Sequence, residues 1–180
     1  MNIYTIVGVA AFVLFIMYDF NQISGNRLAL RLFFPLGIAI LIFSSVRIAL
    51  ISPAVAYPGR GLSALFWFTA AVFFSLLIYT LFFAVPFDAA YVKGSKQRLC
   101  TTGVYAICRH PGVLFLAAAY VFSALAMGKI GFLIAGAIFS VCNVIYVVIQ
   151  DKWIFPRVFE GYEEYQKTVH FLLPLGRMRS

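Results

Sequence analysis

The chain has 180 residues, of which 63% are hydrophobic and 11% are charged, and its mean hydropathy is +0.97. Soluble globular proteins are about 45–50% apolar and about 25% charged, so this composition excludes an ordinary soluble domain and predicts a polytopic membrane protein. The net charge of +8 is spread over loops between apolar segments, without an aromatic-basic motif, so we expect membrane lipids and no nucleic acid as partners.

Five apolar segments predict an all-α transmembrane helix bundle, folded as a single membrane domain over residues 1–180. The first is expected to end at a polar turn that begins with Asp19. The second contains Pro35, which removes a helix hydrogen bond and predicts a kink. The fourth is the shortest. The expected spans are 2–18, 28–51, 62–87, 112–127 and 130–150.

Two hydrophilic segments flank the last pair of spans. The segment 88–110 is the longest connection, and loops of that length in compact domains are usually functional or disordered. The tail 151–180 alternates aromatic and charged residues, which predicts an amphipathic segment at the membrane surface, interrupted by Pro156. The polar residues of these two segments are therefore the candidates for chemistry.

The basic residues predict the orientation in the membrane. Eleven lie on the side of the 88–110 loop and the tail, and three lie on the other side. Because cytoplasmic loops carry the excess of Lys and Arg, we expect the N-terminus outside and the C-terminus in the cytoplasm. The first group is Arg27, Arg31, Lys93, Lys96, Arg98, Arg109, Lys152, Arg157, Lys167, Arg177 and Arg179, and the second is Arg47, Arg60 and Lys129.

The three cysteines do not have the pattern of a disulfide framework. Cys100, Cys108 and Cys142 are an odd number, and their spacing is not that of metal ligands. Cys142 also lies within an apolar segment. The sequence therefore predicts neither a disulfide framework nor a metal site.

A compact polar cluster lies between two apolar segments at residues 100–113. Arg109 and His110 directly precede Pro111, and proline is favoured at the first position of a helix. This places a guanidinium and an imidazole at a helix N-terminus, where free N–H groups and the helix dipole favour anions. The pattern predicts a site for an anionic ligand.

These residues also carry a family resemblance. The spacing of Gly103, Tyr105 and the Arg109-His110-Pro111 run resembles the G-x-Y-x-x-x-R-H-P signature of the isoprenylcysteine carboxyl methyltransferase family and its phospholipid methyltransferase relatives. Asp151-Lys-Trp-Ile154 is similar to the E-x-x-L of that family. Its Y-x-x-Y-x-x-x-V-x-x-x-x-P ending is matched by Tyr162, Tyr165, Val169 and Pro174, so the resemblance covers roughly residues 98–175.

The resemblance implies an integral-membrane enzyme that uses S-adenosylmethionine to methylate a lipid-like or isoprenoid acceptor at the cytoplasmic face. A cation or helix end would hold the carboxylate of the cofactor, and a carboxylate would hold its ammonium or ribose. An acceptor carboxylate needs only orientation, whereas an amine or phenol needs a base. The catalytic candidates are Arg109, His110 and Asp151. The cofactor-binding candidates are Tyr105, Arg109, His110, Pro111, Gly112, Asp151, Tyr162 and Tyr165.

Two other functions stay open. Integral-membrane sterol-type reductases have a similar R-H-P stretch and use NADPH. A non-catalytic lipid-binding protein is favoured by departures from the family pattern: Val113 and Phe115 stand where a tyrosine and a glycine are usual, and Gln150 precedes Asp151 where paired glutamates are frequent. The methyl acceptor and the oligomeric state are left open by the sequence.

Overall fold

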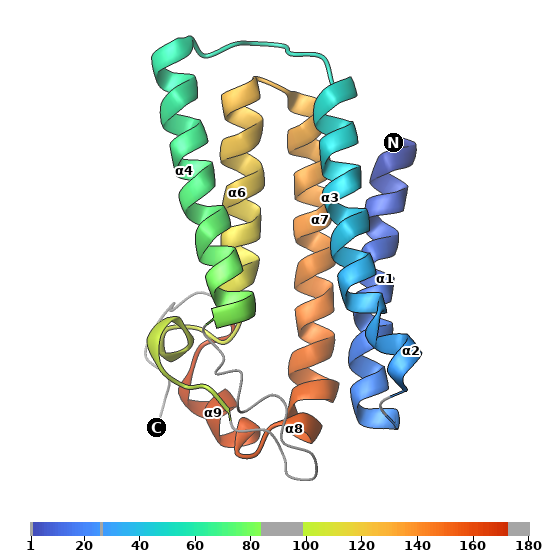
Figure 1. Cartoon of the computed structure of the whole chain (residues 1–180). Helices are drawn as coiled ribbons and strands as arrows, with labels where there is room; N and C mark the ends of the chain where they lie inside the picture. The colour runs from blue at the N-terminus through green and yellow to red at the C-terminus, as the bar shows by residue number, and fades with distance from the viewer. Residues whose placement is uncertain (1, 26, 84–98, 173–180) are drawn as a thin grey trace.

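The computed structural model of the chain describes residues 2–25, 27–83 and 99–172. Over these ranges the chain is helical and contains no β-strand. Four helices are long and apolar enough to cross a membrane, and a fifth apolar helix is shorter (Figure 1). The predicted all-α bundle is confirmed.

Helix α1 (Ile3–Ser24) is longer than expected. Its predicted end at residue 18 is wrong, because the helix continues through Asp19 and Asn21. Both side chains are buried and both have partners: Asn21 bonds the backbone N–H and carbonyl of Arg27 at 2.8 and 3.0 Å, and Asp19 accepts from Gln150. Polar residues that are paired inside the bundle need no turn to expose them.

The second apolar segment is broken as the proline predicts. A short helix α2 (Leu28–Arg31) is followed by α3 (Phe33–Ile51), and the break lies at Leu32, three residues before Pro35. Proline has no N–H to donate to the carbonyl of Arg31, four residues earlier, and its ring clashes with that carbonyl. The kink is therefore confirmed, one helical turn before the proline itself.

Helix α4 (Arg60–Ile78) ends in the π-helical turn η1 (Tyr79–Phe83). The predicted end of this span at residue 87 lies outside the described residues, as do residues 88–98 of the hydrophilic connection. The rest of that connection contains the 3-10 turn η2 (Gly103–Ala106). It leads directly into α6 (Pro111–Met127), which begins at the proline as predicted.

Helix α7 (Ile130–Ile149) does not stop at residue 150. It passes into the π-helical turn η3 (Gln150–Ile154) and then into α8 (Phe155–Val158), so the predicted boundary between the last span and the tail is wrong. Pro156 does not interrupt the helix, because it lies in the first turn of α8, where a missing N–H costs little. Helix α9 (Tyr162–Thr168) is the last helix of the described residues.

The apolar core joins four of the five apolar helices, α1, α3, α6 and α7, while α4 packs against α6 through Phe73, which stacks on Phe122 at 5.7 Å. Helices α6 and α7 approach closely where Gly136 faces Tyr120, since a Cβ at Gly136 would lie 2.6 Å from that of Tyr120. The core residues are Ala11, Phe12, Phe15, Ile48, Tyr120, Ala124, Phe132, Ala135 and Phe139.

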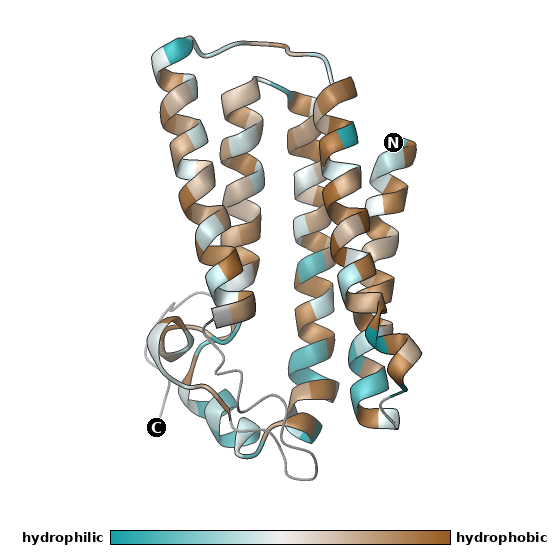
Figure 2. Cartoon of the chain, in the orientation of Figure 1, coloured by the Kyte–Doolittle hydropathy of each residue, from teal (hydrophilic) through white to brown (hydrophobic). Residues whose placement is uncertain are grey.

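The helices alternate in direction and leave two ends of different character (Figure 1). The N-terminus, the 52–59 connection and the turn at Gly128 share one end, where Val55 donates its N–H to the carbonyl of Gly128 at 2.8 Å. Helices α2, α8 and α9 lie at the other end. Figure 2 shows hydrophilic residues gathered in α9 and at the adjacent ends of α1 and α7. The predicted site lies at this second end.

Candidate functional site

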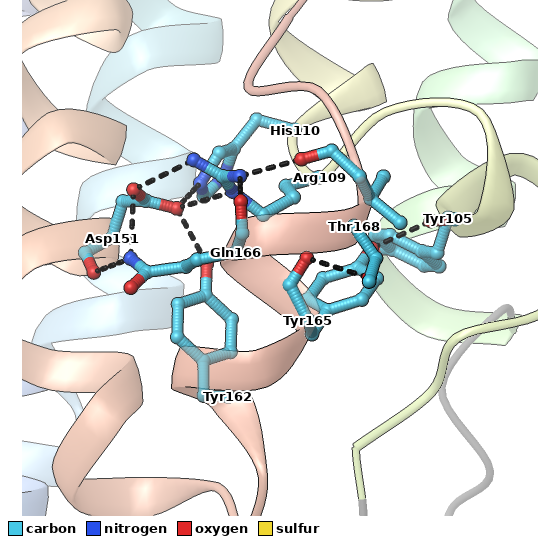
Figure 3. A network of polar contacts seen from close by, with 9 residues as sticks. Tyr105, Arg109, His110, Asp151, Tyr162, Tyr165, Gln166 and Thr168 are labelled. Atoms are coloured by element: carbon cyan, nitrogen blue, oxygen red, sulfur yellow. Dashed lines mark hydrogen bonds and ion pairs between the residues drawn. The ribbon is translucent and has the colours of Figure 1, made fainter. Parts of the chain in front are cut away.

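The carboxylate of Asp151 is the centre of the polar cluster in Figure 3. Asp151 is the second residue of the π-helical turn η3 and is 6% exposed. Four side chains from two segments, the residues before α6 and helix α9, converge on its two oxygens. Oδ1 lies 2.9 Å from Arg109 Nε, 3.1 Å from His110 Nε2 and 2.6 Å from the Tyr162 hydroxyl, and Oδ2 lies 3.2 Å from Arg109 Nη2 and 3.0 Å from Gln166 Nε2.

The side-chain N–H groups of Arg109 donate to other groups of the chain itself. Besides its two bonds to Asp151, Nη1 donates to the backbone carbonyls of Gln166 at 2.8 Å and Val169 at 2.6 Å. The guanidinium carbon also lies 5.7 Å from the centre of the Phe171 ring, and the side chain is 9% exposed. The sequence predicts an anion at this helix end, and in the structure that anion is the chain's own Asp151.

His110 is the residue before the first turn of α6, and it is 6% exposed. Its ring stacks on Phe155 at 5.8 Å and meets the edge of Phe171 at 5.1 Å. Burial lowers the pKa of His110, an effect larger than the opposing influence of Asp151. A neutral imidazole beside an ionised carboxylate must donate to it, so Nε2 carries the proton and Nδ1 keeps a lone pair.

The three predicted tyrosines link the cluster to the transmembrane helices. Tyr162 is buried and donates to Asp151, and burial together with that carboxylate raises the pKa of Tyr162 well above its usual value. Tyr165 donates to the carbonyl of Tyr105 at 2.6 Å, and Tyr105 donates to the carbonyl of Thr80 in η1 at 2.9 Å. Burial raises the pKa of Tyr105 to about 12. All three therefore act as hydrogen-bond donors at neutral pH.

The remaining predicted residues, Pro111 and Gly112, belong to the first turn of α6. Pro111 is buried, and a Cβ at Gly112 would lie 3.5 Å from both Leu77 and Thr80, so this turn packs closely against α4 and η1. The two departures from the family pattern lie just beyond. Val113 is 4% exposed, and the ring of Phe115 lies 6.3 Å from that of Phe73 in α4. Both positions serve the packing of α6.

The tail returns along the R-H-P segment and pairs with it through the backbone. The N–H of Arg109 donates to the carbonyl of His170 at 2.8 Å, and the N–H of His110 donates to the carbonyl of Phe171 at 3.2 Å. These two bonds, with the side-chain bonds of Arg109 to the end of α9, hold the tail against the N-terminus of α6. The described part of the tail is therefore part of the folded site.

Sequence reasoning missed Gln166, whose amide nitrogen donates both to the carboxylate of Asp151 and to its backbone carbonyl at 2.7 Å. A signal was present: Tyr162, Tyr165 and Gln166 have the i, i+3, i+4 spacing of one helix face. It also missed Phe155 and Phe171, the two rings around His110. Their role depends on how the tail folds back, which no local spacing indicates.

An open groove of about 590 Å³ lies beside the cluster. One wall is formed by residues of the segment before η2 and of η2 itself, and the other by α9 and the turn before it. Of the predicted site residues only Tyr165 lines it. Its lining is Leu99, Thr101, Ala106, Glu160, Gly161, Glu164, Tyr165, Thr168 and Val169. The groove thus offers carboxylates and hydroxyls close to the outer face of the polar cluster.

The structure brings all eight predicted residues into one region at one end of the bundle. Arg109, His110, Asp151 and Tyr162 are in direct contact, Tyr105 and Tyr165 are one hydrogen bond apart, and Pro111 and Gly112 adjoin His110. No group of three or more His, Cys, Asp or Glu side chains suited to a metal ion occurs within the described ranges.

Comparison with protein-family models, with curated proteins and with solved structures finds no match to this chain. The assignment of a function therefore rests on the motif residues and on the geometry of the cluster and groove.

Proposed function

We propose that the chain is a membrane-embedded methyltransferase that uses S-adenosylmethionine and acts on a lipid-like acceptor. One observation carries the proposal: the two motif blocks, 42 residues apart, meet in a single cluster in which Arg109, His110 and Tyr162 all contact Asp151. Residues that only marked the membrane boundary would not need to converge on one buried carboxylate. The convergence supports a common role for the R-H-P segment and the tail.

The groove beside Tyr165 is the better place for the cofactor, because the cluster itself is filled by its own contacts. S-adenosylmethionine supplies an electrophilic methyl group on a sulfonium cation. The carboxylates of Glu160 and Glu164 suit its cationic groups, and the Tyr165 ring and the Thr168 hydroxyl suit its adenosine part. A volume of about 590 Å³ lies within the usual range of about 300–1,000 Å³ for such ligands.

In this arrangement Arg109 and Asp151 are positioning residues. Their ion pair fixes α9, and thereby Tyr165 and Glu164, against η2 across the groove. Fixing the walls of a site in one geometry is the main contribution that a protein makes to a transfer reaction between two bound groups. This differs from the sequence expectation that the two side chains hold the cofactor directly.

His110 is the base that the sequence suggests, but it is 6% exposed and does not line the groove. In this arrangement it is therefore a positioning residue, whose neutral ring donates Nε2–H to Asp151. An acceptor carboxylate would need no base.

We place the site at the cytoplasmic face, with the N-terminus outside. The support is the charge distribution: α2 with its N-cap residue, η3, α8 and α9, at the same end of the bundle as the cluster, carry Arg27, Arg31, Lys152, Arg157 and Lys167. Cytoplasmic ends of membrane helices carry such an excess. A cofactor from water and an acceptor from the bilayer then reach the same end of the protein.

A second function, a non-catalytic lipid-binding membrane protein, is favoured by one specific observation. Arg109 makes four hydrogen bonds within the chain, and Asp151 accepts from four side chains, so the cluster is complete without a ligand. In that case the R-H-P segment and the tail form a structural clasp, and the protein binds neither S-adenosylmethionine nor NADPH.

Isothermal titration of the purified protein in detergent decides between these functions. The methyltransferase proposal expects binding of S-adenosylhomocysteine and none of NADPH, while binding of NADPH alone favours the reductase. Glu160→Gln should weaken binding by about twofold to fivefold, the factor for one partly exposed charge. Glu163→Gln is the matched control, since Glu163 lies three residues further along the chain but does not line the groove. If neither ligand binds, the result supports the non-catalytic function, in which the R-H-P segment and the tail form a structural clasp.

A further inference from the structure

Asp19 is a buried carboxyl on a helix that is apolar enough to cross a membrane. It is 4% exposed, and the most apolar window of α1 has a mean hydropathy of 2.0. In the described part of the chain no basic side chain forms an ion pair with it. An ionisable group at such a place is costly to bury, and those that occur usually serve a function.

Asp19 has two partners where α7 passes into η3, namely Gln150 and Tyr146, whose hydroxyl also forms a hydrogen bond with Asp19. Gln150 donates its side-chain N–H to Asp19 Oδ2 at 2.8 Å, and the same nitrogen lies 2.8 Å from the Tyr146 hydroxyl. Gln22, one turn along α1, is 3.5 Å from Oδ1. Asp19 therefore ties α1 to the end of α7 by a bond between residues 131 positions apart.

Gln150 is where the helix changes its geometry. It is the first residue of the π-helical turn η3, and Asp151 is the second. A π-helical turn shifts the direction of the side chains that follow it, and such turns are frequent at functional sites. Gln150 of this turn is held by Asp19 of α1, and the next residue, Asp151, is the centre of the polar cluster. The hydrogen bond of Gln150 therefore affects the direction of the Asp151 side chain.

We propose that Asp19 is a positioning residue for Asp151: by holding Gln150 against α1 it fixes the π-helical turn that directs Asp151 toward Arg109 and His110. Helix α1 is thereby coupled to the site through the adjacent turn η3. The role of this coupling in cofactor binding rests on the function proposed above, whereas its effect on the turn does not.

The chain supplies a matched control for the alternative that Asp19 only stabilises the bundle. Asn21 lies two residues further along α1, is 2% exposed and is equally polar. Its partners are the backbone groups of Arg27 in the turn that follows α1, and none of its hydrogen bonds reaches η3. Loss of Asn21 should cost stability without moving the π-helical turn.

The chain also supplies a reporter on that turn. Of the two tryptophans, Trp153 lies in η3 and is 52% exposed, and Trp67 lies in α4. A Trp67→Phe background leaves Trp153 as the sole tryptophan. In this background the variants Asp19→Leu, Asp19→Asn and Asn21→Leu are compared by Trp153 emission and acrylamide quenching, by melting temperature, and by titration with S-adenosylhomocysteine.

Asp19→Leu is expected to shift the emission of Trp153 and to weaken binding of S-adenosylhomocysteine about fivefold, the factor that one lost hydrogen bond gives. Asp19→Asn should restore both, because its amide oxygen still accepts from Gln150. Asn21→Leu should lower the melting temperature and leave emission and affinity unchanged. If Asp19→Leu does not fold, Gln150→Met removes the same bond from the other side and should shift Trp153 equally.

Three results overturn the proposal: unchanged Trp153 emission in Asp19→Leu or Gln150→Met, no rescue by Asp19→Asn, or equal emission shifts in the Asp19 and Asn21 variants. Each would make Asp19 a purely structural residue. If the wild-type protein binds no S-adenosylhomocysteine, the proposed function fails by itself, because the emission of Trp153 needs no ligand and still decides whether Asp19 positions the turn.

Discussion

The guanidinium of Arg109 and the carboxylate of Asp151 meet through two parallel hydrogen bonds, Nε to Oδ1 at 2.9 Å and Nη2 to Oδ2 at 3.2 Å, although 42 residues separate them. Two-point pairing of this kind fixes both side chains in direction as well as distance. Both side chains are 9% exposed, so the pair lies largely out of water. The loop before α6 and the turn after α7 are therefore joined at one point.

Removal of Arg109 should cost more than any other single change in the loop before α6. Arg109→Ala leaves the buried carboxylate of Asp151 without its cation, and breaking a buried pair in this way costs about 3–5 kcal/mol. We expect a large drop in melting temperature in detergent, measured by the unfolding of the purified variant. Lys167→Ala is the control, since its ion pair with Glu164 is exposed at the surface and should matter little. Equal melting temperatures for the two variants would contradict this account.

Substitution of Tyr162 and of Tyr165 tests whether Asp151 is ionised in the folded protein. Tyr162 and Tyr165 each donate one hydrogen bond of 2.6 Å, the first to a carboxylate and the second to a backbone carbonyl. Bonds to charged groups contribute about 1.5–3 kcal/mol and neutral ones about 0.5–1.5 kcal/mol. Tyr162→Phe should therefore lower the melting temperature more than Tyr165→Phe does. The reverse order would show that Asp151 is not ionised in the folded protein.

His110 predicts a pH dependence of stability. Burial lowers its pKa below the ordinary value of 6.5, so the unfolded chain binds a proton before the folded chain does. Stability is then complete above about pH 6.5 and falls as the pH drops below it. The melting temperature should decrease between pH 7 and pH 5, and the decrease should be smaller in His110→Gln. An equal decrease in both proteins would assign the effect to other groups.

Much of the fold is visible in the sequence because membrane helices are specified by composition. The apolar segments, the kink associated with Pro35 and the start of α6 at Pro111 follow from local chemistry. The ends of α1 and α7 do not. Asp19 and Asn21 look like a turn in the sequence, yet each is paired inside the bundle, and hydropathy contains no information about such pairing.

The candidate site could likewise be predicted only in part from the sequence. The spacing of Arg109 and His110 before Pro111 identifies an anion-binding helix end, and the motifs identify Asp151 and Tyr162. What the spacing does not give is the partner: the anion is Asp151 itself, because the tail folds back over the start of α6. The direction of that return depends on tertiary contacts of the tail and not on any local pattern.

Reporter fusions test whether successive helices cross the membrane in alternating directions. Helix α6 is the critical case, because it is short. With 17 residues at about 1.5 Å each, this helix is about 25 Å long, shorter than a hydrocarbon core of about 30 Å. A hairpin of α6 and α7 that failed to cross would leave Gly128 on the cytoplasmic side. In the structure the carbonyl of Gly128 instead accepts from the N–H of Val55, which belongs to the connection at the opposite end from the site.

We therefore expect reporters fused after Gly59 and after Gly128 to lie on the same, external side of the membrane. Reporters after Gly25 and after Ser180 should both be cytoplasmic, because basic residues accumulate at that end of the bundle. Alkaline phosphatase and green fluorescent protein fusions at the four positions give opposite signals on the two sides. If Gly59 is external and Gly128 cytoplasmic, α6 and α7 do not cross as a pair, and the bond between Val55 and Gly128 cannot exist in the membrane.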